Sequence, residues 1–170
     1  NYGDPIQSCW NRIHNSTYSA YPYVTTGTAS SGNSSMYFSP SSVSILVLPE
    51  IAVSLDSLVV NGKMLGTYYS SYVISVGVIS DVDDAASYEE VGTFEYTNTN
   101  NWDDFEVSLA GYTGQGGHIA IKGTTNTGSF YVDDLTVQRI SNCSRVQNLH
   151  VGTSTTTSAA RSWSDSNEVG

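Results

Sequence analysis

Two adjacent acidic residues, Asp133 and Asp134, interrupt the apolar pattern of the segment 130–140. Apolar residues stand at even positions before the pair, at Phe130 and Val132, and at odd positions after it. Because successive side chains of a strand point to opposite faces, this change of phase predicts either a strand buried on both faces or a β-bulge at the aspartates. Carboxylates and a freed carbonyl suit calcium, so the pair is a candidate metal site. The alternative is that both carboxylates accept hydrogen bonds from backbone amides or a buried tyrosine.

A second acidic cluster consists of Asp81, Asp83 and Asp84. Its spacing is similar to part of a calcium-binding loop, but the glycine and the distal glutamate of an EF-hand are absent. As a solvated loop between two strands the cluster needs no metal. Both interpretations stay open at this point.

The chain contains twelve tyrosines, and two groups of them are candidates for ligand binding. Tyr21 and Tyr23 flank a proline in an expected loop, and Tyr68 and Tyr69 come shortly before an expected strand. A tyrosine ring offers an apolar face to a sugar ring and a hydroxyl to its polar groups. The competing interpretation is that these are ordinary, half-buried strand residues, because tyrosine is enriched in strands.

No arrangement of residues predicts catalysis. The three histidines, His14, His118 and His150, form no His-Glu-x-x-His pattern, and the chain has no Gly-x-Ser-x-Gly elbow. Paired carboxylates for glycoside hydrolysis are defined by distance in space and leave no trace in a sequence. We therefore expect a protein that is not an enzyme.

The charge balance restricts the partners. Six lysines and arginines stand against sixteen aspartates and glutamates, which gives a formal net charge of −10. Nucleic acid and anionic lipid both require a basic surface, so neither is expected as a partner. No apolar run reaches the roughly 18 residues of a membrane span, so no direct membrane insertion is expected. Two cysteines, Cys9 and Cys143, are either bridged or present as thiols.

The hydrophobic pattern predicts an all-β fold. Valine, isoleucine, threonine and tyrosine are abundant, and short apolar runs alternate with Gly, Ser, Asn and Asp clusters. We expect a two-sheet antiparallel sandwich whose core includes Trp10, Phe105, Ile119, Ile121 and Val132. The expected strands cover 35–38, 43–48, 57–65, 72–79, 91–96, 103–109, 118–122 and 130–140.

A series of short segments resembles a known family. The series runs through Ser8-Cys9-Trp10-Asn11-Arg12-Ile13, Tyr21-Pro22-Tyr23, Leu48-Pro49-Glu50-Ile51, Val76-Gly77-Val78-Ile79-Ser80-Asp81, Trp102-Asp103-Asp104-Phe105, His118-Ile119-Ala120-Ile121-Lys122 and Tyr131-Val132-Asp133-Asp134-Leu135. It is similar to the MAM-like, galactose-binding-like jelly-roll modules of Bacteroidetes surface proteins, which are relatives of the cleaved-adhesin domains. The resemblance implies a jelly-roll domain over 1–141 and a structural calcium held by the final strand and N-terminal residues, with Asp4 beside Asp133 and Asp134.

The tail of the chain has a different pattern. Residues 143–149 and 158–163 resemble the opening of a fibronectin type III domain, although Arg161 stands where that family usually has an inward apolar residue. We therefore expect 142–170 to be a linker and a truncated second β domain. Two strands are marginally stable alone, so this part is not expected to form an independent domain.

Together these features predict a non-catalytic, secreted or cell-surface binding module. The expected partner is a glycan, or a host or cell-surface protein. The alternative is a rigid spacer or protein-interaction module attached to a secreted hydrolase.

Overall fold

The structure is a computed structural model. It describes residues 9–15, 21–39, 43–66, 72–98, 100–123, 128–140, 147–154 and 159–164, and for the last two ranges it describes the backbone. Contacts divide the chain into two compact units, Asn1–Arg139 and Ile140–Gly170. No helix among the described residues is long and apolar enough to cross a membrane.

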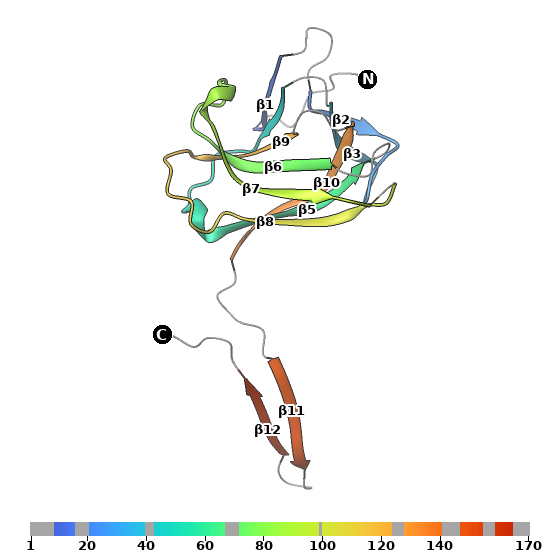
Figure 1. Ribbon diagram of the computed structural model, residues 1–170, viewed down its shortest axis with the longest axis vertical. Coiled ribbons are helices and arrows are strands. Elements are labelled where there is room, and N and C mark those ends of the chain that lie inside the picture. Colours follow the sequence, from blue (N-terminus) through green and yellow to red (C-terminus); the bar gives the residue numbers. More distant parts are fainter. Residues whose placement is uncertain are drawn as a thin grey trace. The chain divides into compact units, whose positions relative to one another are not determined.

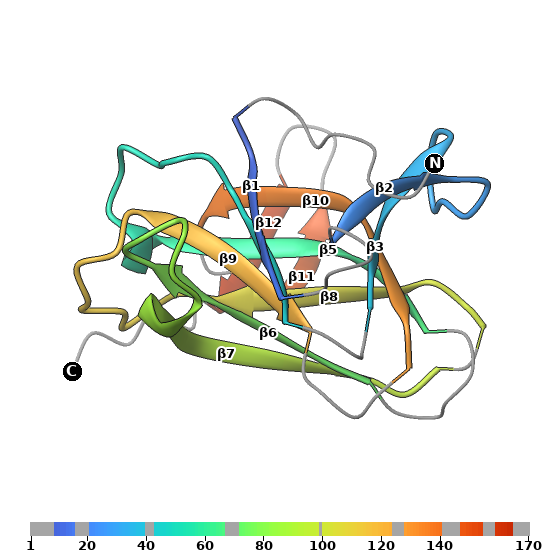
Figure 2. The ribbon, with the colours of Figure 1, turned by 90° about the horizontal axis from the view of Figure 1, so that it is seen from above.

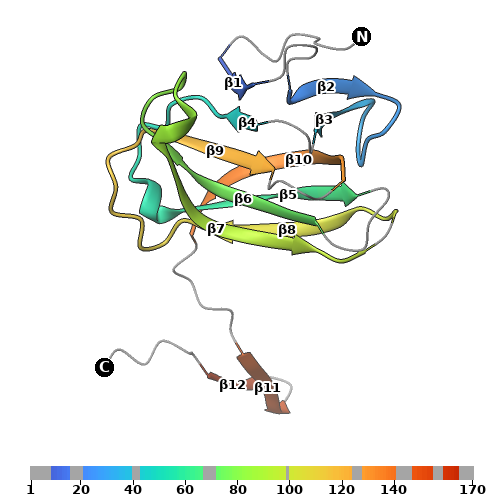
Figure 3. The ribbon, with the colours of Figure 1, turned by 45° about the horizontal axis from the view of Figure 1, so that its top comes forward.

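The first unit consists of two five-stranded antiparallel sheets, which can be followed by their strand labels in Figure 1 and Figure 3. Sheet A has the order β1-β4-β9-β6-β7, and sheet B has the order β2-β3-β10-β5-β8. The strands are β1 (Asn11–His14), β2 (Tyr23–Thr26), β3 (Ser34–Phe38), β4 (Ser44–Val47), β5 (Leu58–Gly66), β6 (Tyr72–Ile79), β7 (Tyr88–Tyr96), β8 (Asp103–Ser108), β9 (His118–Gly123) and β10 (Phe130–Arg139). Two short 3₁₀ turns, η1 (Leu55–Ser57) and η2 (Ala85–Ser87), precede β5 and β7. The prediction of an all-β, two-sheet antiparallel sandwich is confirmed.

The core lies between the sheets and follows the alternation of the strands. Phe105, Ile119, Ile121 and Val132 are each at most 2% exposed, as the sequence predicted. Trp10 is an exception, because its side chain is only partly buried and packs against the core from its margin. Residue 10 directly precedes the edge strand β1, which pairs with a neighbour on one side only, so less of the sheet is available to cover this residue.

Of the two interpretations of the phase change, a bulge or a strand buried on both faces, β10 has the bulge. Its pairing with β5 shifts register between Asp133 and Thr136, and Asp134 has a positive φ of 50°. Before the bulge Phe130 and Val132 face the core, and after it Leu135 and Val137 pack against the same core. One additional residue therefore restores the inward phase, so the strand need not be buried on both faces.

Two strands differ from the sequence-based expectation. Asn11–His14 and Tyr23–Thr26 form β1 and β2, although 21–23 was expected to be a loop. Both are four-residue edge strands that pair with a neighbour on one side only. Such short strands are held by their partner, and their own sequences show no apolar alternation.

The second unit contains one antiparallel pair, β11 (Gln147–Ser154) and β12 (Ala159–Ser164). The pairing shifts register twice, between Gln147 and His150 and between Val151 and Ser154.

Candidate functional site

A row of tyrosines crosses the outer face of sheet B. Tyr23 on β2 lies opposite Tyr37 on β3, and Tyr37 lies opposite Tyr131 on β10. The Tyr23 and Tyr37 ring centroids are 5.1 Å apart, and those of Tyr37 and Tyr131 are 5.2 Å apart. Residues in direct register on adjacent strands share a face, and strands are about 4.8 Å apart, so the rings follow the spacing of the sheet. We call Tyr23, Tyr37 and Tyr131 the tyrosine row.

The alternation of side chains along β3 and β10 places the tyrosine row on the outer face of sheet B. Phe38 and Phe130, the strand neighbours of two row members, are buried and stack at 4.7 Å with an interplanar angle of 9° in the core. Tyr37 and Tyr131 therefore point outward, and both are partly exposed. Tyr23 is only 8% exposed. The ring of Tyr37 is also held through its hydroxyl, which donates to Ser129 Oγ at 2.6 Å.

Tyr21 extends the row at its β2 end. Its ring centroid is 5.4 Å from that of Tyr23 and 6.0 Å from that of Tyr37, and its side chain is partly exposed. All these ring pairs are tilted by 39–60° rather than stacked, an arrangement that aromatic pairs favour. The surface therefore presents a ridge of aromatic edges and faces that runs across the strands.

The sequence found part of this cluster. Tyr21 and Tyr23 were candidates and lie together, whereas Tyr68 and Tyr69 lie outside the described residues, so their role stays a prediction. Tyr37 and Tyr131 were not singled out. Each tyrosine stands between two apolar residues that face the core in an expected strand, so the alternation of the strand predicts that the tyrosine faces outward. This alternation was the signal in the sequence that could have identified them.

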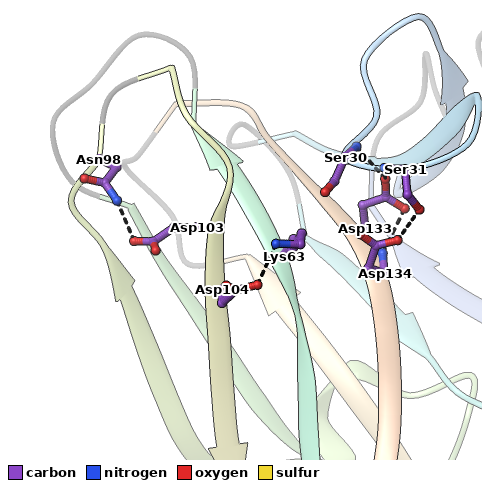
Figure 4. Close-up of polar contacts among 8 residues, drawn as sticks. All are labelled: Ser30, Ser31, Lys63, Asn98, Asp103, Asp104, Asp133 and Asp134. Atoms are coloured by element: carbon purple, nitrogen blue, oxygen red, sulfur yellow. Dashed lines mark hydrogen bonds and ion pairs between the residues drawn. The ribbon is translucent and has the colours of Figure 1, made fainter.

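A polar depression of about 320 Å³ lies on the same face, one row further along the strands. Across it Lys63 pairs in register with Asp104, and Asn61 pairs with Glu106. Lys63 Nζ is 2.7 Å from Asp104 Oδ1 (Figure 4), and this hydrogen bond raises the pKa of the lysine. The depression is lined by Asn61, Gly62, Lys63, Asp104, Phe105, Glu106 and Asp134.

The two bulge aspartates bind the turn between β2 and β3. Asp133 Oδ2 accepts from the amides of Ser30 at 2.7 Å and Ser31 at 3.2 Å. Asp133 Oδ1 accepts from the amide of Asp134 at 2.8 Å, and Ser31 Oγ donates to Asp134 Oδ1. Figure 4 shows the serines facing the aspartates, and Figure 2 shows the hairpin beside β10. The bulge therefore anchors the hairpin that carries two members of the tyrosine row.

The aspartate pair alone does not supply a calcium shell. Calcium takes six to eight oxygen ligands, and the described residues contain no group of three acidic, histidine or cysteine side chains placed to hold a metal. Asp133 already accepts three amide hydrogens. Asp4 lies outside the described residues, so calcium at this position stays a prediction.

The other acidic cluster organises a loop. Asp81 Oδ1 accepts from the amide of Asp83 at 3.0 Å, and Asp84 Oδ1 accepts from the amide of Ala86 at 2.8 Å, as the N-cap of η2. Both carboxylates therefore satisfy backbone amides at the start of a turn. The cluster therefore lies in a hydrogen-bonded loop between β6 and β7.

A smaller cavity of about 200 Å³ opens between the sheets. Leu46 of sheet A and Met36 and Val132 of sheet B line it, with Trp10 beside them. Asp133 and Asp134 lie at the same cavity, so the bulge borders both this cavity and the polar depression. Of the cysteines, Cys9 is exposed and Cys143 lies outside the described residues.

One polar cluster in sheet A contains a nucleophilic side chain. Ser75 Oγ lies 2.6 Å from the Tyr88 hydroxyl and 2.5 Å from Glu90 Oε2, and Ser75 is 1% exposed. Burial raises the pKa of Tyr88. A buried serine between a phenol and a carboxylate, with no histidine in these contacts, is a structural hydrogen-bond network. His118 is engaged elsewhere, with Nδ1 2.9 Å from the carbonyl of Leu48.

Comparison with known proteins shows the fold. No protein-family model matches the chain, and no curated protein sequence matches it significantly. Among solved structures, the K1 cleaved adhesin domain of Lys-gingipain from Porphyromonas gingivalis W83 superposes with a TM-score of 0.60 at 13% identity, over 80% of this chain and 94% of that one. The first unit therefore has a jelly-roll sandwich fold.

Carbohydrate-binding modules share the same architecture. The CBM22-1 xylan-binding domain of Paenibacillus barcinonensis Xyn10C gives a TM-score of 0.51 at 14% identity, over 81% of this chain and 89% of that one. The family 30 carbohydrate-binding module of a Clostridium thermocellum cellulosomal cellulase gives 0.55 at 12% identity, over 77% of this chain and 92% of that one.

Proposed function

We propose that the chain is a non-catalytic carbohydrate-binding module, and that its binding surface is the tyrosine row of sheet B together with Tyr21. The tyrosine row is the main observation that supports the proposal. The partly exposed rings of Tyr21, Tyr37 and Tyr131 follow one another at centroid distances of 6.0 and 5.2 Å and offer repeated apolar contact to a chain of sugar rings, while the buried ring of Tyr23 supports them. The neighbouring depression adds carboxylate and amide oxygens that accept hydrogen bonds from sugar hydroxyls. Solved structures of similar fold that are named xylan-binding and carbohydrate-binding modules support this assignment.

The alternative, a spacer or a module that adheres to proteins, has less support from the surface. An adhesive protein contact would be expected to expose a contiguous apolar patch. Among the described residues, Val53 is the single large apolar side chain that is exposed, at 37%. The aromatic surface is instead made of side chains with hydroxyls, which suits a hydrated ligand.

The proposed setting is the cell surface or the outside of the cell. Jelly-roll neighbours that are adhesin domains and polysaccharide-binding modules support it. In this proposal the tail 142–170 is the start of a fibronectin type III domain that joins the module to a further part of a Bacteroidetes surface protein, and a structural calcium at Asp133 and Asp134 remains part of the proposal.

The test is a glycan microarray with the full 170-residue chain, followed by affinity electrophoresis in the polysaccharides that bind. Tyr37→Ala removes the central ring and is expected to weaken binding at least tenfold, which is about 1.4 kcal/mol. Tyr37→Phe keeps the ring and should retain most of the affinity. Tyr88→Ala is the matched control, because it removes a tyrosine of sheet A. The proposal is wrong if no glycan binds, or if Tyr37→Ala and Tyr88→Ala bind equally well.

A further inference from the structure

The polar depression lies directly beside the tyrosine row. Tyr131 and Asp133 are two residues apart on β10, and Leu65 and Lys63 are two apart on β5, so each pair shares a face at a spacing of about 6.5 Å. Tyr131 pairs with Leu65, and Asp133 pairs with Lys63. A ligand wider than one sugar ring that lies on the row therefore reaches the depression.

The charges around the depression have one predominant sign. Three carboxylates line it, those of Asp104, Glu106 and Asp134. The one cation in its lining, Lys63, is held by Asp104 at 2.7 Å. Asp104 is also highly exposed, with a side-chain exposure of 82%, so its negative charge reaches the surface.

The Arg12 guanidinium lies toward the other end of the row. Arg12 of sheet A donates to the carbonyl of Pro22 at 3.3 Å, next to Tyr21. Among the described cations, Lys122 lies over the Tyr88 ring in the opposite sheet, and Arg139 pairs in register with Leu58 beyond the bulge. None of them lines the depression. The β10–β5–β8 end of the face is therefore electronegative.

We infer that this face selects glycans without negative charge and rejects uronate-bearing and sulfated ones, through the carboxylates of Glu106, Asp104 and Asp134. The inference rests on the proposed carbohydrate-binding function and specifies its ligand class. Carboxylates accept hydrogen bonds from the hydroxyls of a neutral sugar, whereas an anionic substituent meets like charge and supplies no proton. At about 4 Å in water such a repulsion is about 1 kcal/mol, or about fivefold in affinity.

The experiment uses matched soluble polysaccharides with the full chain. The hydroxyethyl and carboxymethyl ethers of the same β-glucan, and of the same xylan, differ mainly in the charge of the substituent. Affinity electrophoresis at low salt should show the carboxymethyl form binding about fivefold or more weakly than the hydroxyethyl form. The difference should shrink at about 0.5 M salt, because surface charges are then screened over a few ångströms.

Glu106→Lys places a cation in the depression and should reduce or invert the difference in affinity between the hydroxyethyl and carboxymethyl ethers. Its control is Glu89→Lys, an exposed residue of β7 in the opposite sheet, which changes the net charge equally. Equal binding of the two ethers by the wild-type chain would overturn the inference while leaving the proposed function intact. The inference would also be overturned if the two lysine variants changed the affinity difference between the ethers equally, because the net charge of the chain and not the depression would then discriminate between the ligands. If neither ether nor any array glycan binds, the proposed function fails, and the inference fails with it.

Discussion

The outer faces of the two sheets differ in what covers them. On sheet A, a second apolar cluster of Ile45, Val47, Ile79 and Ala120 is fully buried. It lies opposite the main core, because Leu46, between two of its members, belongs to that core. On sheet B the outer face carries the tyrosine row and the polar depression. The outer face of sheet A therefore contributes to stability, and the outer face of sheet B carries the proposed binding surface.

The cover of sheet A is the segment between β6 and β7, drawn in green in Figure 1. Val82, Ala85 and Tyr88 from this segment and the start of β7 pack on the second cluster. The segment is fixed by Ser87, whose hydroxyl donates toward the carbonyls of Asp81 at 3.1 Å and Asp84 at 2.9 Å. These hydrogen bonds within the loop hold it over sheet A. On sheet B, the turn that joins β2 and β3 instead donates a hydrogen bond to Asp133 of β10.

The largest expected effect concerns the covered face. Ile79→Ala removes a fully buried side chain of the second cluster and should lower the free energy of unfolding by about 2–5 kcal/mol. Glycan binding well below the melting temperature should be unchanged. Urea denaturation measures the loss, and the exposed Val53→Ala, expected to stay within about 0.5 kcal/mol of wild type, is the control. A loss below about 1 kcal/mol for Ile79→Ala would mean that the loop does not make a packed second core.

A smaller effect is expected at Asp133, on the outer face of sheet B. Asp133→Ala leaves the amides of Ser30 and Ser31 without their acceptor and should cost about 1–3 kcal/mol of stability. It should also weaken glycan binding, because the hairpin with Tyr23 and Tyr37 loses its anchor. Denaturation and affinity electrophoresis measure the two losses. Asp133→Asn keeps one acceptor oxygen and should fall between wild type and alanine; identical behaviour of all three would contradict the anchoring role.

The same variant tests the calcium hypothesis. A ligand that binds only the folded state at about 100 times its Kd stabilises by about 2.7 kcal/mol. If calcium binds at the aspartate pair, a chelator should lower the melting temperature of the wild-type chain and leave that of Asp133→Ala unchanged. A wild-type melting temperature that does not respond to chelator would leave the two carboxylates as hydrogen-bond acceptors alone.

The smallest effect concerns alkaline stability of the covered face. Burial raises the pKa of Tyr88 in the folded chain above its unfolded value of about 10. Its contribution to stability is therefore complete below pH of about 10 and is lost as the pH rises further. Tyr88→Phe should cost about 1 kcal/mol near pH 8, through the lost bond to Ser75, and should flatten the alkaline decline. Denaturation curves near pH 8 and above a pH of about 10 measure the two effects. If stability declined as steeply with alkaline pH in Tyr88→Phe as in the wild type, Tyr88 would not be the group responsible.

Local pattern was sufficient for the strands that form the interior. The alternation of Phe105 and Val107 with polar neighbours predicted β8, and the phase change at Asp133 reduced the choices to a bulge or a strand buried on both faces. Each of these signals is contained in a few consecutive residues. The short edge strands β1 and β2 gave no such signal, because a strand with one partner and a mostly solvated surface needs little apolar alternation.

The proposed binding surface could not be predicted in the same way. Tyr23, Tyr37 and Tyr131 become neighbours only through the strand order β2-β3-β10, which joins the first and last thirds of the unit. The bonds from Ser30 and Ser31 to Asp133 likewise span more than a hundred residues. Residue type identified the aspartates and some tyrosines as candidates, whereas their mutual positions depend on long-range pairing that one sequence does not show.

The position of β10 also determines when the tyrosine row can form during synthesis. It is the last strand of the first unit, yet it lies in the middle of sheet B between β3 and β5. Until residues 130–139 have left the ribosome, β3 and β5 lack the strand between them and the hairpin lacks its anchor. Such non-local pairing is slow to form and leaves strand edges open in the meantime. The tyrosine row is therefore complete only in a chain that includes β10, and a nascent or prematurely ended chain without this strand lacks Tyr131 and the anchor of the hairpin.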